Sequence, residues 1–190
     1  MASPIKLAVL RTTAYASIFN YHLSFEELYR YLISSEPVSK IKLKPYFIAK
    51  SDPINHFNQL KWSLARKAAK ILSFIPSVKM IAVTGALAMN NAVENDDIDL
   101  MIITAANRLW LTRLLASLLL FPWLRRGRKI HNRVCLNLWL DESALALTQR
   151  NLYIAHEICQ AKPVFERDNT YQKFIAANLW YKKFLPNWTI

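Results

Sequence analysis

Scarcity of glycine is the feature that most restricts what this chain can fold into. Among its 190 residues only Gly85 and Gly127 are glycines. Glycine-rich phosphate loops need several glycines at fixed spacing, because the backbone must turn sharply and approach the ligand closely. The sequence therefore excludes both a Walker P-loop and a G-x-G-x-x-G dinucleotide fingerprint.

Carboxylates gather in the stretch GALAMNNAVENDDIDLMIIT, which runs from position 85 to position 104. It holds Glu94, Asp96, Asp97 and Asp99, although the chain has only 13 acidic residues against 25 lysines and arginines, a formal net charge of +12. Such a basic chain favours polyanions such as nucleotides, nucleic acids or anionic membrane surfaces. A local excess of acids in it therefore calls for its own explanation.

The segment DIDLMIIT is expected to form a strand, on which side chains alternate between faces. Asp97 and Asp99 would then point the same way, with Ile98 directed into the core. Two carboxylates about 4 Å apart repel each other by roughly 4 kcal/mol at an effective dielectric constant of 20. A proton or a cation must offset this repulsion, and Mg²⁺ is a natural partner because it prefers oxygen ligands.

Gly85 ends the preceding apolar segment KMIAVTG, and residues with helix-forming character follow it. A glycine at a strand-to-helix turn allows backbone amides to approach an anion, and a helix N-terminus favours phosphate. One element could thus hold a phosphate while the next holds the cation that bridges it. This arrangement suits phosphoryl or nucleotidyl transfer, in which positioning and charge neutralisation supply most of the catalysis.

These residues resemble the signature of the polymerase-beta-like nucleotidyltransferase superfamily. In that signature, glycine-serine is followed after a spacer by aspartate-hydrophobic-aspartate-hydrophobic, and here Gly85-Ala86 precedes the segment 97–100, DIDL. The chain resembles small prokaryotic nucleotidyltransferase-domain proteins with a short N-terminal helical module. The core motif covers a short stretch, and a looser similarity covers most of the chain.

The resemblance implies a metal-dependent transfer of a nucleoside monophosphate from a nucleoside triphosphate to an acceptor hydroxyl, with a nucleic acid or a protein as a possible acceptor. Asp97 and Asp99 would ligate Mg²⁺, and Gly85 and Ala86 would contact the nucleotide. The third catalytic carboxylate would correspond to Asn137, which carries no charge and cannot serve as a base. The alternative is a catalytically degenerate module of the same fold that binds nucleotide or nucleic acid for regulation.

Strand and helix patterns alternate along the chain, which predicts an α/β or α+β fold with a mixed sheet flanked by helices. Residues 1–53 are expected to form a short helical module similar to a reduced winged helix, and residues 54–190 the nucleotidyltransferase-like domain with C-terminal helices. The expected helices cover 5–19, 24–33, 55–75, 109–124, 149–161 and 169–184. The expected strands cover 79–85, 97–104 and 133–140, with 42–50 as a short strand or extended arm.

Two local patterns refine the helix predictions. Ser24 and Glu27 have the spacing of a capping box. In the helix expected over 55–75, an apolar stripe that includes Leu60 should face the core, with Lys61 and other basic residues mostly off it.

Cys135 and Cys159 lie in apolar segments, which favours two buried thiols in a reducing cytoplasm over a disulfide. The apolar stretch from Leu114 to Leu124 is too short to span a bilayer, which needs about 20 residues. It is expected to be a buried helix, with contact at a membrane surface left open. The basic segment LRRGRK, 124–129, is either a contact for phosphate or RNA backbone or a solvated loop.

Overall fold

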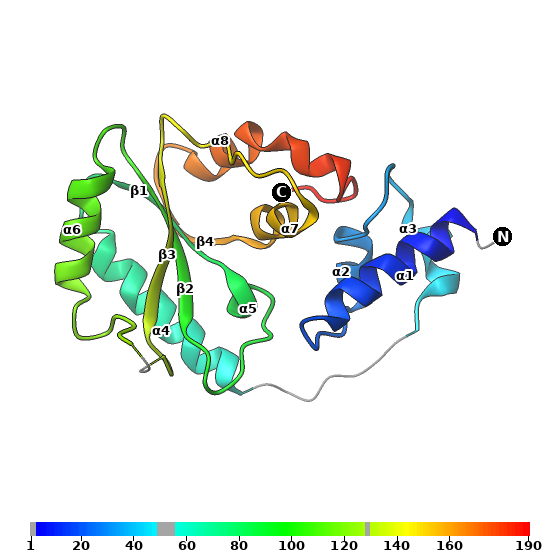
Figure 1. Cartoon of the computed structure of the whole chain (residues 1–190), viewed down its shortest axis with the longest axis horizontal. Coiled ribbons are helices and arrows are strands. Elements are labelled where there is room, and N and C mark those ends of the chain that lie inside the picture. The colour runs from blue at the N-terminus through cyan, green and yellow to red at the C-terminus, as the bar shows by residue number, and fades with distance from the viewer. Residues whose placement is uncertain (1–2, 49–55, 128–129) are drawn as a thin grey trace. The chain divides into compact units, whose positions relative to one another are not determined.

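The computed structural model describes residues 3–48, 56–127 and 130–190 (Figure 1). The chain divides into two compact units. Unit 1 comprises Met1–Ile54, Thr148–Cys159 and Leu179–Ile190, and unit 2 comprises Asn55–Leu147 and Gln160–Asn178. The boundary expected between residues 53 and 54 stays a prediction.

Unit 1 is helical. The Ser24–Glu27 capping box is present at the start of its second helix, with Glu27 N donating to Ser24 Oγ and Ser24 N donating to the Glu27 carboxylate. The helices of this unit are α1 (Pro4–Ser17), α2 (Phe25–Arg30), α3 (Lys40–Leu43), η1 (Lys44–Tyr46), α7 (Leu152–Gln160) and η2 (Leu179–Lys183).

The strand or extended arm expected over 42–50 is wrong for its described part up to Tyr46. Helix α3 and the 3-10 helix η1 occupy this segment instead, and Pro45 lies in the first turn of η1. Proline fits a first helical turn because its missing N–H has no partner to lose there. Residues 49 and 50 lie outside the described residues.

Unit 2 contains a four-stranded mixed sheet flanked by helices, which confirms the predicted fold class. The strand order is β3-β2-β1-β4; β1 is antiparallel to β2 and β4, and β2 is parallel to β3. The elements are α4 (Phe57–Leu72), β1 (Val78–Val83), α5 (Gly85–Ala88), β2 (Ile98–Thr104), α6 (Leu109–Leu119), β3 (Val134–Asp141), β4 (Lys162–Glu166) and α8 (Thr170–Ala177).

Strand β4 has no counterpart among the predicted elements. It is five residues long and contains Pro163. Proline argues against a strand from sequence alone, because it cannot donate to the ladder. It is tolerated here because β4 lies at the edge of the sheet, paired with β1 only.

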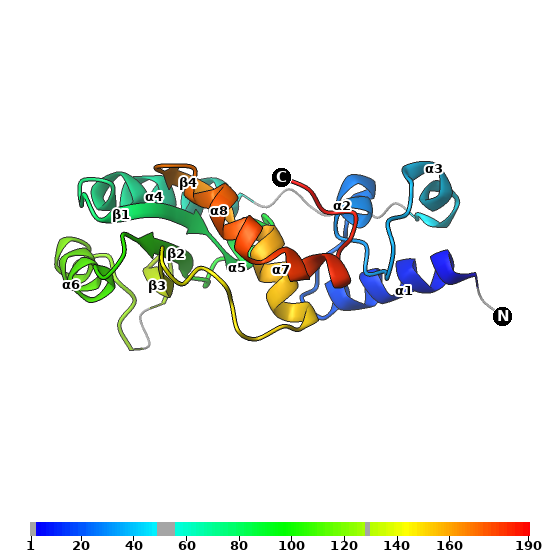
Figure 2. The ribbon, with the colours of Figure 1, turned by 90° about the horizontal axis from the view of Figure 1, so that it is seen from above.

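One apolar core lies between the sheet and the helices α4 and α6. Small residues of α4 and α6, such as Ala68 and Ala116, pack on alternate strand residues such as Ile81, Leu100 and Val134. Helix α8 packs against β1 and β4, and in Figures 1 and 2 the sheet separates it from α4 and α6. The even-numbered side chains of β2 thus face this core, and odd-numbered Asp99 is directed to the other face.

Candidate metal and nucleotide site

The two acids singled out by the sequence come together at the start of β2. Asp97 directly precedes the strand, and Asp99 is its second residue. One ligand atom from each, together with the Sγ of Cys135, lies within 4.8 Å of the other two. All three side chains are partly exposed, so the cluster is accessible to a ligand from solvent.

Burial and charge both act on Asp99. Removal from water raises the pKa of its carboxyl above the usual value, and repulsion from Asp97 raises it further. Both effects disfavour the ionised form. A bound cation would reverse this preference, so the pair fits a divalent metal with oxygen ligands.

Gly85 lies directly beside the Asp99 carboxylate of this pair. Its φ is +62°, in the left-handed region that glycine adopts without steric cost. A Cβ added at this position would lie 2.8 Å from Asp99 Oδ2. The missing side chain therefore lets the carboxylate approach the turn between β1 and α5, where Gly85 and Ala86 are located.

Thr84 directly precedes this turn. Its Oγ1 is buried and has no hydrogen-bond partner within the described part of the chain. Its backbone N–H donates to Asp99 O at 3.0 Å, which ties the turn to β2.

Arg125 belongs to the basic segment 124–129, but the sequence did not predict that it lies beside the acid pair. Its Nη1 donates to Asp97 Oδ2 at 2.7 Å, and Asp97 is only 16% exposed. Its backbone N–H donates to Val134 O at 2.8 Å, and Leu124 forms a bridge with Val134. Helix α6 ends at Leu119, before the predicted end at Leu124. The short pairing after it places the guanidinium beside the acids.

Cys135, and not Asn137, is the β3 residue beside the acid pair. Asp99 pairs with Cys135 in the parallel register, and the thiol hydrogen-bonds to the Asp99 carboxylate. Burial, reinforced by the charge of Asp99, raises the pKa of the Cys135 thiol to about 11. At neutral pH this thiol is therefore protonated, and it donates to Asp99.

Asn137 lies further along β3 in a β-bulge. The register passes from Leu100↔Leu136 to Met101↔Leu138, so Asn137 is the extra residue of this bulge, and its side chain is exposed. A bulge changes the alternation of side chains along a strand. Counting residues along the sequence cannot reveal this change.

The loop before Asp97 is anchored by a buried lysine. Lys61 of α4 is 1% exposed, and its Nζ donates to Glu94 O at 3.0 Å, Asp96 O at 2.6 Å and Asn132 Oδ1 at 2.9 Å. The expectation that Lys61 lies off the buried stripe is therefore wrong, as is the core position of Leu60, which is 51% exposed. The inward face of α4 is shifted because its first turns contact the acidic loop.

A hollow of about 310 Å³ adjoins the acid cluster. Arg113, Ser117, Arg125, Cys135 and Trp139 are among the residues that line it. Its volume is at the lower end of the range for small-molecule sites. Two arginines in its wall make it suited to an anionic ligand.

The described arginines of the basic segment 124–129 thus make different contacts. Arg125 pairs with Asp97, whereas the guanidinium of Arg126 lies 3.4 Å from the centroid of the Phe121 ring. Arg128 and Lys129 lie outside the described residues.

No family model matches the chain, and no curated protein matches it either. Among solved structures, one match is a mutant of the toxin–antitoxin MntA-HpeT, with 16% identity, a TM-score of 0.35 and coverage of 59% of this chain and 81% of that chain. Another is a toxin–antitoxin crystallised with AMP-PNP, with 17% identity, a TM-score of 0.34 and coverage of 59% and 84%. Similarity at this level does not establish a shared activity.

The residues that carry the resemblance to the polymerase-beta-like nucleotidyltransferase superfamily do meet in space. Gly85 lies against Asp99, and Asp97 and Asp99 converge. The structure thus brings Gly85, Asp97 and Asp99 together in one place.

Proposed function

We propose that unit 2 is a nucleotidyltransferase-type domain that binds a nucleoside triphosphate through a divalent cation, with Mg²⁺ as the expected ion. Its reaction would transfer the nucleoside monophosphate to a hydroxyl of a nucleic-acid or protein acceptor. The observation that carries the proposal is the convergence of Asp97 and Asp99 against the turn at Gly85. Repulsion between the two carboxylates favours a bound cation, although Arg125 already offsets part of the charge of Asp97.

Each residue of the site has a role in this proposal. Asp97 and Asp99 would hold the cation, which when bound neutralises the phosphate charge and lowers the pKa of an attacking hydroxyl. The backbone at Gly85 and Ala86 would approach the phosphates, because no side chain of Gly85 stands in the way. Arg125, which lies beside Asp97, would pair with phosphate oxygens bidentately.

Turnover of labelled nucleoside triphosphates in the presence of Mg²⁺ tests this function. Asp97→Asn and Asp99→Asn should each lower turnover by at least about a hundredfold, because each removes a charge that the cation needs. Asp168→Asn is the matched control, since Asp168 pairs with Lys79 on the surface of unit 2. Wild-type turnover that survives the double substitution of Asp97 and Asp99 would refute the proposal.

A binding module without turnover is the second candidate, and Cys135 favours it. The thiol beside Asp99 supplies no charge where a third carboxylate could join the acid pair, and Arg125 already neutralises Asp97. Calorimetry that detects Mg²⁺-dependent nucleotide binding, without product from any acceptor tried, would select this candidate.

The third position can be tested directly. Cys135→Asp should create or increase turnover, because it places a third carboxylate beside Asp99. Asn137→Asp is the matched variant on the same strand and should have no effect from its bulge position. Activation by Asn137→Asp alone would return the third role to Asn137.

We also propose a reducing, cytoplasmic location. Cys135 and Cys159 are both free thiols, and burial raises the pKa of each.

A further inference from the structure

Helix α6 has its large apolar side chains on the outside. Its buried residues are the small Thr112 and Ala116, and Thr112 Oγ1 hydrogen-bonds to Ser77 Oγ at 2.6 Å. Trp110 is 77% exposed, and Leu114 and Leu118 are 57% and 63% exposed. A helix packed only on its core would have the opposite arrangement, so this outer face is suited to a partner surface.

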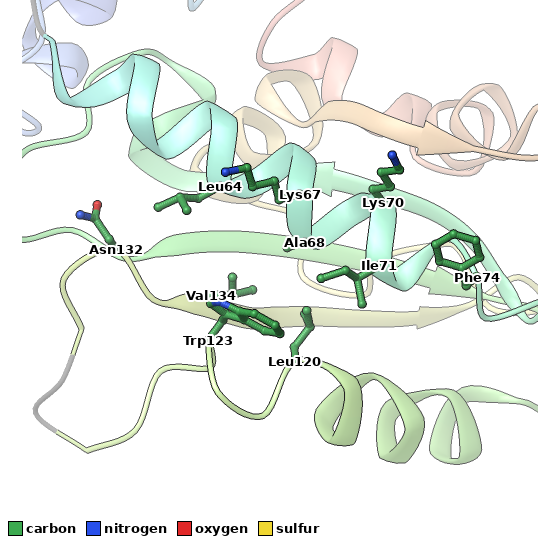
Figure 3. Close-up of a pocket in the computed structure, with 10 residues that line it drawn as sticks. All are labelled: Leu64, Lys67, Ala68, Lys70, Ile71, Phe74, Leu120, Trp123, Asn132 and Val134. Carbon is green, nitrogen blue, oxygen red and sulfur yellow. The ribbon is translucent and has the colours of Figure 1, made fainter.

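The apolar surface continues from α6 into a groove towards α4 (Figure 3). The groove has a volume of about 360 Å³ and a lining that is mostly apolar, including Ile71 and Phe74 of α4 and Leu120 and Trp123 after α6. In Figure 3 the side chains of Trp123, Leu120 and Ile71 point into the space between α4 and the end of α6. Exposed apolar patches of this extent mark interaction sites.

The charge of this face has one sign. Positions 53–93 and 100–140 contain no aspartate or glutamate, so α4, α6 and the turn after α6 carry only basic charges. Exposed basic residues lie on both helices: Arg66, Lys67 and Lys70 on α4, and Arg108 and Arg113 at α6. We call this surface of α4 and α6 the basic apolar face.

We propose that the basic apolar face binds the surface of an anionic lipid bilayer. Leucine and tryptophan would enter the boundary between headgroups and acyl chains, while the arginines and lysines contact lipid phosphates. Trp110 and Trp123, near the two ends of α6, suit this boundary because their rings combine apolar area with a polar N–H. Among the described residues, no helix is long and apolar enough to cross a bilayer, so α6 would lie in its plane.

The basic charge and the apolar side chains together disfavour the other occupants of this face. A second copy would bring two surfaces of like charge together, and like charges oppose association. Nucleic acid would match the charge but would leave the leucines of α6 exposed. An anionic bilayer matches both the charge and the apolar side chains.

Vesicle flotation with the full chain tests this proposal. The chain should float with vesicles of equal parts phosphatidylglycerol and phosphatidylcholine and not with phosphatidylcholine alone, and salt should weaken binding. Leu114→Gln combined with Leu118→Gln should lower vesicle affinity by about tenfold or more, because two exposed apolar side chains are lost. Lys67→Gln combined with Lys70→Gln should lower it by roughly tenfold without altering the apolar residues.

Ile18→Gln combined with Ile41→Gln is the matched control, because these residues are 71% and 85% exposed but belong to unit 1. This control should bind vesicles as the unchanged chain does. Equal flotation with the two kinds of vesicle, or full binding by the Leu114 and Leu118 variant, would overturn the proposal. Dimers in light scattering that the same variant dissociates, without vesicle binding, would assign the face to a second copy.

Discussion

At the scale of single residues, the site requires that position 85 has no side chain, as is the case for Gly85. Two separate requirements meet there: a φ of +62° and the approach of Asp99 Oδ2 to where a Cβ would be. Gly127 shares only the first, with a φ of +52° and no atom within 4 Å of an added Cβ. The chain therefore contains its own control for the effect of close packing at the site.

Gly85→Ala should be more harmful than Gly127→Ala. Both alanines must adopt a left-handed conformation, which costs about 1–2 kcal/mol. Only the alanine at 85 must also displace the Asp99 carboxylate, so its loss of unfolding free energy should be larger by at least about 1 kcal/mol. Urea denaturation of both variants measures this difference, and equal losses would show that Asp99 yields without cost.

At the scale of elements, α4 determines where the acidic loop lies. Lys61 donates to two backbone carbonyls of that loop, and Trp62 Nε1 donates to Asn90 Oδ1 at 2.8 Å. Asn58 adds hydrogen bonds to Asn90 O and from Ala92 N. One helix thus holds the loop at both ends, from Asn90 after α5 to Asp96 before β2.

Lys61→Met should destabilise unit 2 by about 3 kcal/mol, because it leaves two partly buried carbonyl groups of the loop and Asn132 Oδ1 without their donor. It should also speed hydrogen exchange at residues 94–97, since the loop loses its anchor. Lys67→Met on the same helix is the control, because Lys67 is exposed. A loop that exchanges no faster in the Lys61 variant would contradict this anchoring role.

The stability of unit 1 depends on pH because a buried histidine lies where α1 packs against α7. His156 is 4% exposed, its ring stacks on Tyr15 with centroids 4.3 Å apart, and burial lowers its pKa from 6.5 to about 4. The folded state thus binds this proton less tightly than the unfolded chain. The stability that neutral His156 contributes is complete above 6.5, its ordinary pKa in the unfolded chain. It is lost as pH falls through about 4, its pKa in the folded state.

His156→Phe should keep the ring stack and remove this dependence. Between pH 7 and pH 4 the unchanged chain should lose about 3 kcal/mol more unfolding free energy than the variant. Urea denaturation at both pH values gives the comparison. A parallel loss in the two proteins would mean that His156 is protonated in the folded state without penalty.

Local patterns predicted the parts of the site that lie close together in sequence. Gly85, Asp97 and Asp99 could be predicted from the sequence, because strand alternation and a strand-to-helix turn act over short distances. The positions of Arg125 and Cys135 beside the acids could not be predicted. They depend on the register of β3 against β2 and on the bridge between Leu124 and Val134. Register between parallel strands is a tertiary property, and a single sequence does not reveal it.

At the scale of the whole molecule, three separate parts of the chain build unit 1. Asn187 hydrogen-bonds to Tyr29 O and to both backbone groups of Val38, and Arg30 donates to Thr189 O. The C-terminal segment is thus held by the N-terminal helices. The sequence pattern of the helix expected over 169–184 does not indicate which helices it packs against.

A fragment of residues 54–190 tests whether the boundary at 53/54 separates independent folding units. This fragment keeps α7 and the last twelve residues of unit 1, 179–190, but lacks α1 and α2. We expect it to aggregate or to unfold at lower urea concentration than the whole chain, because apolar surface loses its cover. A fragment as stable as the whole chain would place the boundary where the sequence predicted it.

The central claim is that Asp97 and Asp99 jointly hold a cation beside a phosphate-binding turn. Isothermal titration of AMP-PNP into the full chain, with and without Mg²⁺, tests it most directly. The account predicts binding that requires Mg²⁺ and is lost in Asp97→Asn and Asp99→Asn but kept in Asp168→Asn. Binding of equal strength without Mg²⁺, or binding that both site variants retain, would contradict it.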